Sequence, residues 1–194
     1  MQVSAIKQIL SLFLLAVVTF IVPTMANAES GKYQSAINRF KKAPEVDSFF
    51  NESYGFAIFP TVGKGGIGIG GAYGEGRVYR QNKYVGDTSL SQLTFGLQFG
   101  AQAYSEIIFF KNKAAFLSFT SNSFEFGAQA SAVALTIGAS ATAGSNGVSA
   151  SAGEKQSVAK YIDDMAVFTV TKGGLMYEAS IGGQGFTFAP NDDF

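Results

Sequence analysis

The spacing of apolar residues after position 29 predicts a helix before anything else. Between Ser30 and the proline at position 44, Tyr33, Ile37 and Phe40 recur at helical intervals and share one stripe. Basic residues occupy much of the remaining surface of this segment. The pattern is typical of an amphipathic helix with one apolar face and one charged face.

A second, shorter helix is predicted immediately afterwards. Pro44 interrupts the first periodic run, and proline is well tolerated in the first turn of a helix. Glu45 and Asp47 would then lie near the positive end of the helix dipole. The apolar side of this helix would consist of Val46, Phe49 and Phe50.

From Tyr54 the period changes to two, which indicates strands. The run from Tyr54 to Tyr79 is rich in glycine and aromatic residues, and its first strand is expected to end at Pro60 or to lie at a sheet edge. Glycine at alternate positions removes side chains from one face, so that a strand can coil strongly and another backbone or ring can approach closely.

The clearest alternation runs from Gln92 to Ala103, where Leu, Phe and Ala residues share one face and Gln, Thr and Gly residues share the other. One face of this strand must be buried. Turns are expected at Asn146-Gly147, Lys172-Gly173-Gly174 and Gly182-Gly183. Further strands are expected over Ile107 to Phe110, Ser123 to about Ile137, Ala166 to Thr171, Leu175 to Ile181 and Phe186 to Phe188.

Together these elements predict an α+β fold. A glycine-rich, largely antiparallel and barrel-like β-sheet would be covered by the N-terminal amphipathic helices. Residues 29–194 are long enough for one domain with a core of its own.

Residues 1–28 resemble a cleaved signal peptide. Lys7 precedes an apolar stretch from Ile9 to Val22, and the small-residue site Ala26-Asn27-Ala28 follows it. The apolar stretch is short for a membrane span, which needs about 20 residues. We therefore expect an exported protein, periplasmic or secreted, with cleavage after Ala28.

The composition removes most classes of enzyme. The chain has no His and no Cys, which excludes the Ser-His-acid triad, thiol nucleophiles and ordinary zinc or copper sites. Asp163-Asp164 is the one adjacent acidic pair within the predicted fold, and neighbouring strand residues point to opposite faces, which disfavours paired-carboxylate catalysis. Basic and acidic residues number 14 each, so no overall charge favours nucleic acid. We expect no enzymatic activity and no cofactor.

The run after Tyr54 contains a glycine motif whose spacing also occurs in nucleotide-binding sites. Gly66-Ile67-Gly68-Ile69-Gly70-Gly71 satisfies the spacing G-x-G-x-x-G of dinucleotide sites. Such a site requires the motif to open a helix, so that the pyrophosphate meets the helix N-terminus. Residues 72–79 contain two more glycines and indicate turn and strand. The motif is therefore predicted to be structural.

An ordered series of motifs resembles the SYLF domain family, over about Ala36 to Pro190. The series consists of Ala57-Ile58-Phe59-Pro60, Lys64-Gly65-Gly66, Gly68, Gly70, Gly71, Gly74-x-Gly76, Gly96-x-Gln98-x-Gly100-x-Gln102, Glu106-Ile107-Ile108-Phe109-Phe110, Tyr161 and Lys172-Gly173-Gly174-Leu175. The resemblance implies binding of membrane phospholipid through a basic amphipathic N-terminal segment. The chain has no SH3 or FYVE module, so actin regulation is not inferred.

The resulting hypothesis is a non-enzymatic, exported domain that binds anionic phospholipid peripherally. Cations of the first helix would meet lipid phosphates, and phenylalanines of the helices would contact acyl chains or line a groove. The expected lipid-binding residues are Lys32, Arg39, Phe40, Lys41, Lys42, Phe49 and Phe50. The sequence does not identify a protein partner.

Three alternatives stay open at this point. The basic helix can equally be an ordinary amphipathic helix with its charges in water. The alternating strands and the C-terminal Phe194 are compatible with a small outer-membrane β-barrel, although few segments reach the strand length that such a barrel needs. A structural or partner-binding envelope protein without a lipid ligand is also compatible with the sequence.

Overall fold

A computed structural model describes residues 29–127, 135–136, 160–174, 183–192 and 194. The predicted signal peptide, the strand predicted over Leu175 to Ile181 and the turn predicted at Asn146-Gly147 lie outside these residues, as does most of the strand predicted from Ser123.

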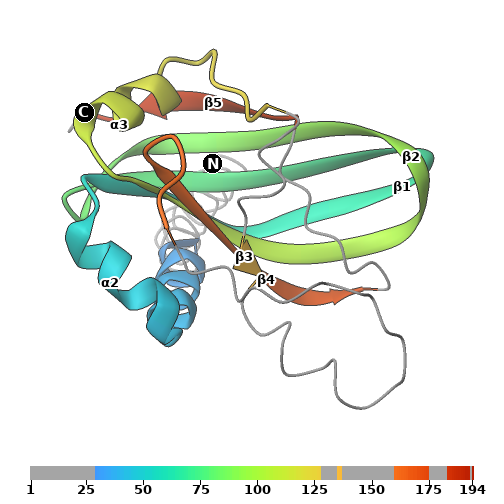
Figure 1. Ribbon diagram of the computed structural model, residues 1–194, viewed down its shortest axis with the longest axis horizontal. Helices are drawn as coiled ribbons and strands as arrows, with labels where there is room; N and C mark the ends of the chain where they lie inside the picture. The colour runs from blue at the N-terminus through green and yellow to red at the C-terminus, as the bar shows by residue number, and fades with distance from the viewer. Residues whose placement is uncertain (1–28, 128–134, 137–159, 175–182, 193) are drawn as a thin grey trace, which may run out of the picture.

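Both predicted helices are confirmed. The N-terminal helix extends over 29–41, and α2 follows over Pro44–Glu52 with its proline in the first turn. The apolar stripe of each helix is buried, including Tyr33, Phe40 and Phe49. The helices lie side by side against one face of the sheet (Figure 1).

The sheet is built around one very long antiparallel hairpin. Strand β1 covers Gly55–Arg80 and strand β2 covers Lys83–Phe110, paired along nearly their whole length. Gln81 and Asn82 connect them with φ of 50° and 65°, the left-handed geometry of a two-residue hairpin turn. Both strands bend back near their middle, so the hairpin curls over itself (Figure 1).

Pro60 does not end the first strand but lies on an edge strand, the other outcome that the sequence predicted, because β1 pairs only with β2 among the described strands. Strand β1 continues through it, and the register with β2 shifts between Phe59 and Val62. A β-bulge accommodates proline because one residue there makes no ladder hydrogen bond. The hydroxyl of Ser105 donates to the Pro60 carbonyl at 2.8 Å and supports the backbone at the irregularity.

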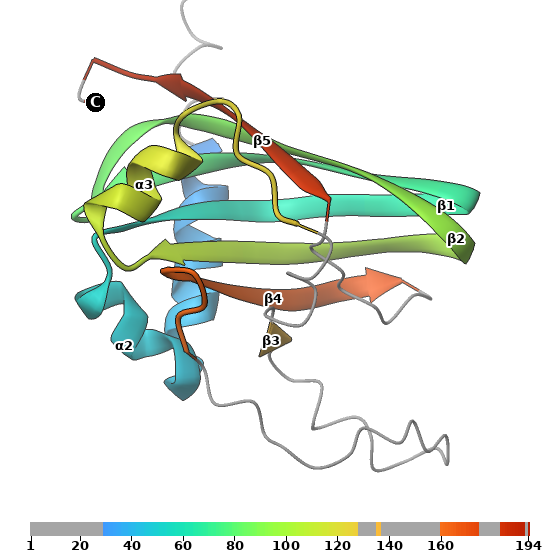
Figure 2. The ribbon, with the colours of Figure 1, turned by 45° about the horizontal axis from the view of Figure 1, so that its top comes forward.

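Three further strands complete an open, curled sheet. Strand β4, Met165–Gly174, pairs antiparallel with the end of β2, and β5, Gln184–Pro190, pairs antiparallel with its beginning (Figure 2). The short β3, Leu135–Thr136, runs parallel to β4. The turn predicted at Lys172-Gly173-Gly174 is wrong, because these residues belong to β4 and its two glycines pair with Gln102 and Ala103.

The curled sheet separates two apolar cores. The inner core fills the concave side and includes Phe59, Leu90, Phe110 and Phe186, with helix α3, Lys113–Phe119, packed against it. The outer core lies between the sheet and the two N-terminal helices. The observed fold is thus the predicted α+β arrangement, with helices over a barrel-like sheet that does not close among the described strands.

Two glycines of β1 allow the strand to fold back upon itself. A Cβ atom at Gly74 would lie 2.8 Å from a methyl group of Val62, and one at Gly76 would lie 2.6 Å from the ring of Phe59. Real side chains do not approach this closely, so the second half of β1 packs on the first half only because these positions lack side chains.

The buried face of β2 near the bend is its polar face. Gln92 and Gln102 are buried, whereas Leu93 and Ala101 on the opposite face are exposed. The predicted alternation is thus present at the two ends of this segment, and Gln92 and Gln102 face the concave interior.

The Asp163-Asp164 pair forms a turn. Both residues have positive φ, 49° and 61°, and they connect Ile162 to Met165 at the start of β4. Asp164 accepts a hydrogen bond of 2.8 Å from the side chain of Asn112, the N-cap residue of α3. The pair thus has a structural role at the junction of α3 and β4.

Candidate functional site

The four predicted cations lie at the surface of the N-terminal helix and the short loop after it. Lys32, Arg39, Lys41 and Lys42 are all exposed, while the helix buries its apolar stripe against the sheet. Lys32 and Arg39 are seven residues apart and share one flank of the helix. Lys41 lies instead over the ring of Phe50 in α2, with its ammonium 5.1 Å from the ring centre. The structure therefore divides the cluster between two flanks.

The three predicted phenylalanines belong to the outer core. Phe40, Phe49 and Phe50 are 0%, 6% and 5% exposed. Phe49 packs edge-on against Phe168 of β4, with ring centres 5.0 Å apart, and Phe50 packs edge-on against Phe109 of β2 at 4.9 Å. In this conformation their rings face the sheet, and acyl chains would reach them only if the helices moved away from it.

Lys172 is a cation that the sequence analysis did not assign to the site. It lies on β4, and its ammonium donates to the hydroxyl of Thr61 on β1 at 2.8 Å. Partial burial lowers the pKa of Lys172, and the neighbouring positive charge of Arg39 lowers it further. Within the described part of the chain neither Arg39 nor Lys172 forms an ion pair.

Like charges that act on each other without a carboxylate partner favour an anion nearby. The arrangement joins helix and sheet, because Arg39 comes from the N-terminal helix and Lys172 from β4. The sequence analysis used Lys172-Gly173-Gly174 as a family motif and a predicted turn. The position of Lys172 near the helix could not be predicted, because it depends on the pairing of β4 with β2.

A hollow of about 410 Å³ lies beside Thr61, between the N-terminal helix and β1. Lys32 forms part of its wall, and the other lining residues are Pro60, Thr61, Gly63, Tyr73, Gly74 and Glu75. Lys32 also contacts Glu29 at 3.4 Å, but both side chains are about half exposed, so this pair is weak. We call the surface formed by Lys32, Arg39, Lys172 and Thr61 the cationic groove.

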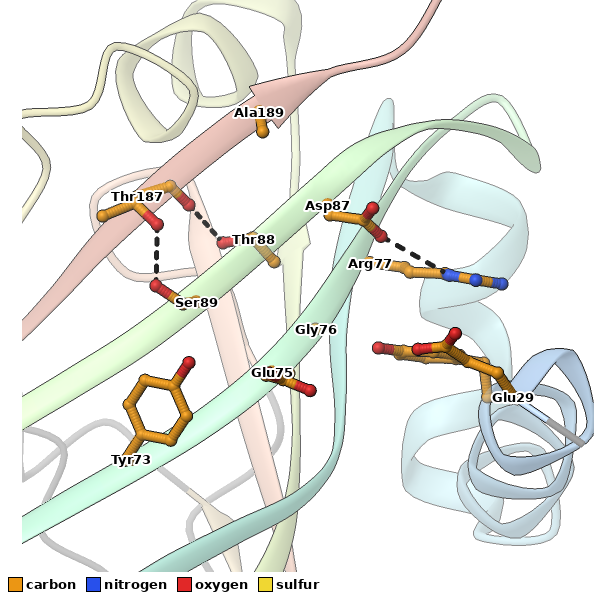
Figure 3. A pocket seen from close by; sticks show the side chains of 11 residues that line it. Glu29, Tyr73, Glu75, Gly76, Arg77, Asp87, Thr88, Ser89, Thr187 and Ala189 are labelled. Carbon is orange, nitrogen blue, oxygen red and sulfur yellow. Dashed lines mark hydrogen bonds and ion pairs between the residues drawn. The ribbon is translucent and has the colours of Figure 1, made fainter. Parts of the chain in front are cut away.

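A second hollow, of about 330 Å³, shares Tyr73 and Glu75 with the first (Figure 3). Its lining is more acidic, because Glu29, Glu75 and Asp87 line it together with Arg77, whereas the charged residues of the first hollow are Lys32 and Glu75. Hydroxyl groups of β2 and β5 complete the wall, as in the 2.7 Å contact between the side chains of Ser89 and Thr187. An anionic ligand therefore fits the cationic groove better than this acidic hollow.

Arg77 connects the acidic hollow to the helix layer. Its guanidinium lies 4.4 Å from the ring centre of Tyr33 and 4.8 Å from that of Tyr84, and its Nε is 3.5 Å from Asp87. Burial raises the pKa of Tyr33 to about 12, with the charge of Arg77 acting in the opposite direction. Arg77 thus anchors the N-terminal helix to the hairpin, on the side of Tyr33.

The concave interior contains a buried carboxyl group. Glu106 and Gln184 are 0% exposed, and the Gln184 amide donates to one oxygen of Glu106 at 3.1 Å and to the hydroxyl of Tyr104 at 3.2 Å. The other oxygen of Glu106 has no partner among the described residues. Burial raises the pKa of Glu106 to about 8, with the Gln184 hydrogen bond opposing the shift.

Neither a metal site nor a membrane-spanning helix is present in the part of the chain that the structure describes. No group of three acidic residues there has the geometry to hold a metal ion. None of the described helices has the length and apolar character needed to cross a bilayer.

Comparison with known proteins gives one match. The family described as "Ysc84: Las17-binding protein actin regulator" matches residues 91–193, more than half of the chain. The matched range contains the glycine and glutamine positions of β2, Tyr161 and Lys172, and it excludes the N-terminal helix and β1. No curated protein matches the chain in sequence.

Proposed function

Because the chain belongs to the Ysc84 family of SYLF domains, a family of non-catalytic binding domains, we propose that it binds anionic phospholipid at a membrane surface. The expected signal peptide would place this lipid in a bacterial envelope, with the protein periplasmic or secreted. The headgroup phosphate would lie in the cationic groove, against Lys32, Arg39 and Lys172.

The observation that carries the proposal is the 2.8 Å hydrogen bond that holds the Lys172 ammonium at Thr61, a residue of the hollow that Lys32 also lines. The positive charge of Arg39 acts on Lys172 and lowers its pKa. A phosphate at this surface would reduce the repulsion among these cations and accept hydrogen bonds from their side chains. Thr61 already engages Lys172 and would orient its ammonium group toward the ligand.

The remaining predicted residues have a supporting role in this proposal. Lys41 and Lys42 would add long-range attraction to an anionic surface, since each basic residue near such a surface contributes about 1 kcal/mol. Phe40, Phe49 and Phe50 would fix the helix on the sheet, and through it the positions of Lys32 and Arg39.

Vesicle co-sedimentation tests the proposal. Residues 29–194 are mixed with vesicles of phosphatidylcholine containing phosphatidylglycerol, and the double variant Arg39→Glu/Lys172→Glu is compared with the parent. We expect at least about tenfold weaker binding of the variant, since two favourable contacts become repulsive. Binding of the parent should also fall as salt is added, because salt screens exposed charges.

The matched control is Lys83→Glu/Lys113→Glu, which changes net charge equally at the hairpin turn and at α3. It should retain most of the parent's binding. A third variant, Lys41→Glu/Lys42→Glu, should show a smaller loss than the groove variant. Equal binding of the parent and the groove variant would refute the assigned site, and absence of binding by the parent would favour a partner-binding protein without a lipid ligand.

A further inference from the structure

Four large apolar side chains are exposed together at the bend of the β1–β2 hairpin. Ile67, Ile69, Tyr73 and Leu93 are 77%, 61%, 57% and 62% exposed. Most large apolar residues in the described structure are buried in the two cores, so this concentration at one place is unusual. We call these four residues the apolar bend.

Ile69, Tyr73 and Leu93 belong to one face. Ile69 and Tyr73 alternate along β1 with the buried Gly70 and Ala72, so they point to the same outer side of the sheet. Ile67, on the other side of a register shift, is exposed as well. Leu93 pairs with Gly71, which lies between Ile69 and Tyr73 and has no side chain. Leu93 is therefore a diagonal neighbour of both residues, and the apolar surface is continuous across the two strands.

Both strands lack charge throughout the bend. No Asp, Glu, Lys or Arg occurs from Gly65 to Gly74 or from Thr88 to Ser105. The backbones of the two strands pair on both sides of the bend, Ile67 with Phe99 and Ile69 with Phe95, and the register shifts between these pairs. The ladder therefore satisfies the backbone on either side of the shift, and no charge would have to be desolvated.

The apolar bend adjoins the cationic groove through Tyr73, which lines the hollow beside Thr61 together with Lys32. An apolar surface next to cations has the charge pattern of an interfacial membrane contact, where apolar side chains enter below the headgroups and cations meet phosphates. A tyrosine at the border suits this boundary, since its ring is apolar and its hydroxyl is polar.

From this geometry we infer that the apolar bend inserts into the interfacial region of an anionic phospholipid bilayer while the cationic groove holds a headgroup. The inference rests on the proposed function and adds an element to it. The membrane contact is then made by strands of the hairpin, and the phenylalanines of the helices stay in the outer core. Insertion is shallow, because the exposed Glu75 borders the charge-free segment of β1.

The chain contains no tryptophan, so a single introduced tryptophan reports on its own position without background. Ile67→Trp and Leu93→Trp are made in residues 29–194 and mixed with vesicles of phosphatidylcholine containing phosphatidylglycerol. We expect their emission to shift to shorter wavelength and to be quenched by lipids with brominated acyl chains. The matched control Leu117→Trp, on α3 and 48% exposed in the parent, should change little.

A second variant tests the energetic contribution. Ile67→Ser/Ile69→Ser should bind the same vesicles at least about tenfold more weakly, because two apolar side chains no longer leave water. Both serines would be exposed, so the far-ultraviolet circular dichroism and the unfolding midpoint should stay close to those of the parent.

The outcomes separate this inference from the proposed function. Binding that depends on Arg39 and Lys172, with unchanged emission from Ile67→Trp and Leu93→Trp, would overturn the insertion and leave the groove intact. A blue shift without vesicles, accompanied by a doubled mass in light scattering, would also overturn it and assign the apolar bend to contact between two copies of the chain. Absence of any vesicle binding would refute both proposals.

Discussion

The side chains of Gln184 and Glu106 form a hydrogen bond of 3.1 Å inside the curled sheet, between residues that are 78 positions apart. Gln184 lies on β5, which pairs with the beginning of β2, and Glu106 lies near the end of β2, so the contact connects two distant parts of the curled sheet. It places a carboxyl group where water does not reach it, and the pH dependence of stability follows from that burial.

We expect the protein to be most stable in mild acid. Burial raises the pKa of Glu106 to about 8 in the folded protein, above its ordinary value of 4.5 in the unfolded chain. Between these values the folded protein retains a proton that the unfolded chain has lost. The contribution of Glu106 to stability is therefore complete below about pH 4.5 and decreases as the pH rises toward 8, by about 1.4 kcal/mol per pH unit.

Urea unfolding between about pH 5 and pH 8 measures this dependence. The isosteric variant Glu106→Gln should lose most of it and should be more stable than the parent at the alkaline end. The exposed Glu52→Gln is the control and should retain the parent's slope. A parent whose stability is independent of pH over this range would contradict the assignment.

Gly76→Ala should destabilise the fold by about 1 to 3 kcal/mol, the usual cost of overpacking. The new Cβ would lie 2.6 Å from the ring of Phe59 and 2.9 Å from the carbonyl oxygen of Ile58, where the two halves of β1 meet. Gly63→Ala on the same strand has nothing within 4 Å of its new Cβ and should be neutral or slightly stabilising. Denaturant unfolding compares the two variants, and equal stability would show that β1 does not fold back as described.

Asn112→Ala should cost about 1 to 2 kcal/mol in unfolding free energy, because it removes the N-cap of α3. The side chain of Asn112 accepts a hydrogen bond of 2.9 Å from the backbone N–H of Ala115 and donates one of 2.8 Å to Asp164. The comparison variant Asp164→Asn keeps an acceptor oxygen and loses only the exposed 3.8 Å ion pair with Lys111, so it should change stability little. A larger loss for Asp164→Asn than for Asn112→Ala would contradict this assignment.

Arg77→Lys should lower the unfolding free energy by about 1 to 2 kcal/mol, although the charge is retained. A planar guanidinium can lie against the rings of Tyr33 and Tyr84 together, whereas an ammonium is a compact, strongly hydrated charge. The control is Arg80→Lys, whose guanidinium is 5.9 Å from the centre of the Phe194 ring, and its loss should be smaller. Thermal or denaturant unfolding measures both variants, and identical losses would show that the stacking contributes nothing.

Local patterns were sufficient to predict the kinds of element and their chemistry. The spacing of Tyr33, Ile37 and Phe40 predicted the first helix and its buried stripe, because helical geometry places these residues on one face. Pro44 predicted the start of the second helix, because proline restricts the backbone locally and fits the first turn. The motif series identified the family, whose match over residues 91–193 confirms it. The sequence predicted that Pro60 would end a strand or lie at a sheet edge, and pairing with β2 alone decided for the edge, with a register shift beside the proline.

Long-range packing determined the site. Alternation along a strand shows which residues share a face, but the elements that cover the sheet decide which face is buried. In β2 the covered face is the one with Gln92 and Gln102, and Leu93 on the other face is exposed to solvent. The charge of Arg39 acts on Lys172, 133 positions away in the chain, because β4 pairs with β2 and brings Lys172 toward the N-terminal helix. The apolar bend likewise exists because the charge-free segments of β1 and β2 pair with each other beyond the area that the helices cover.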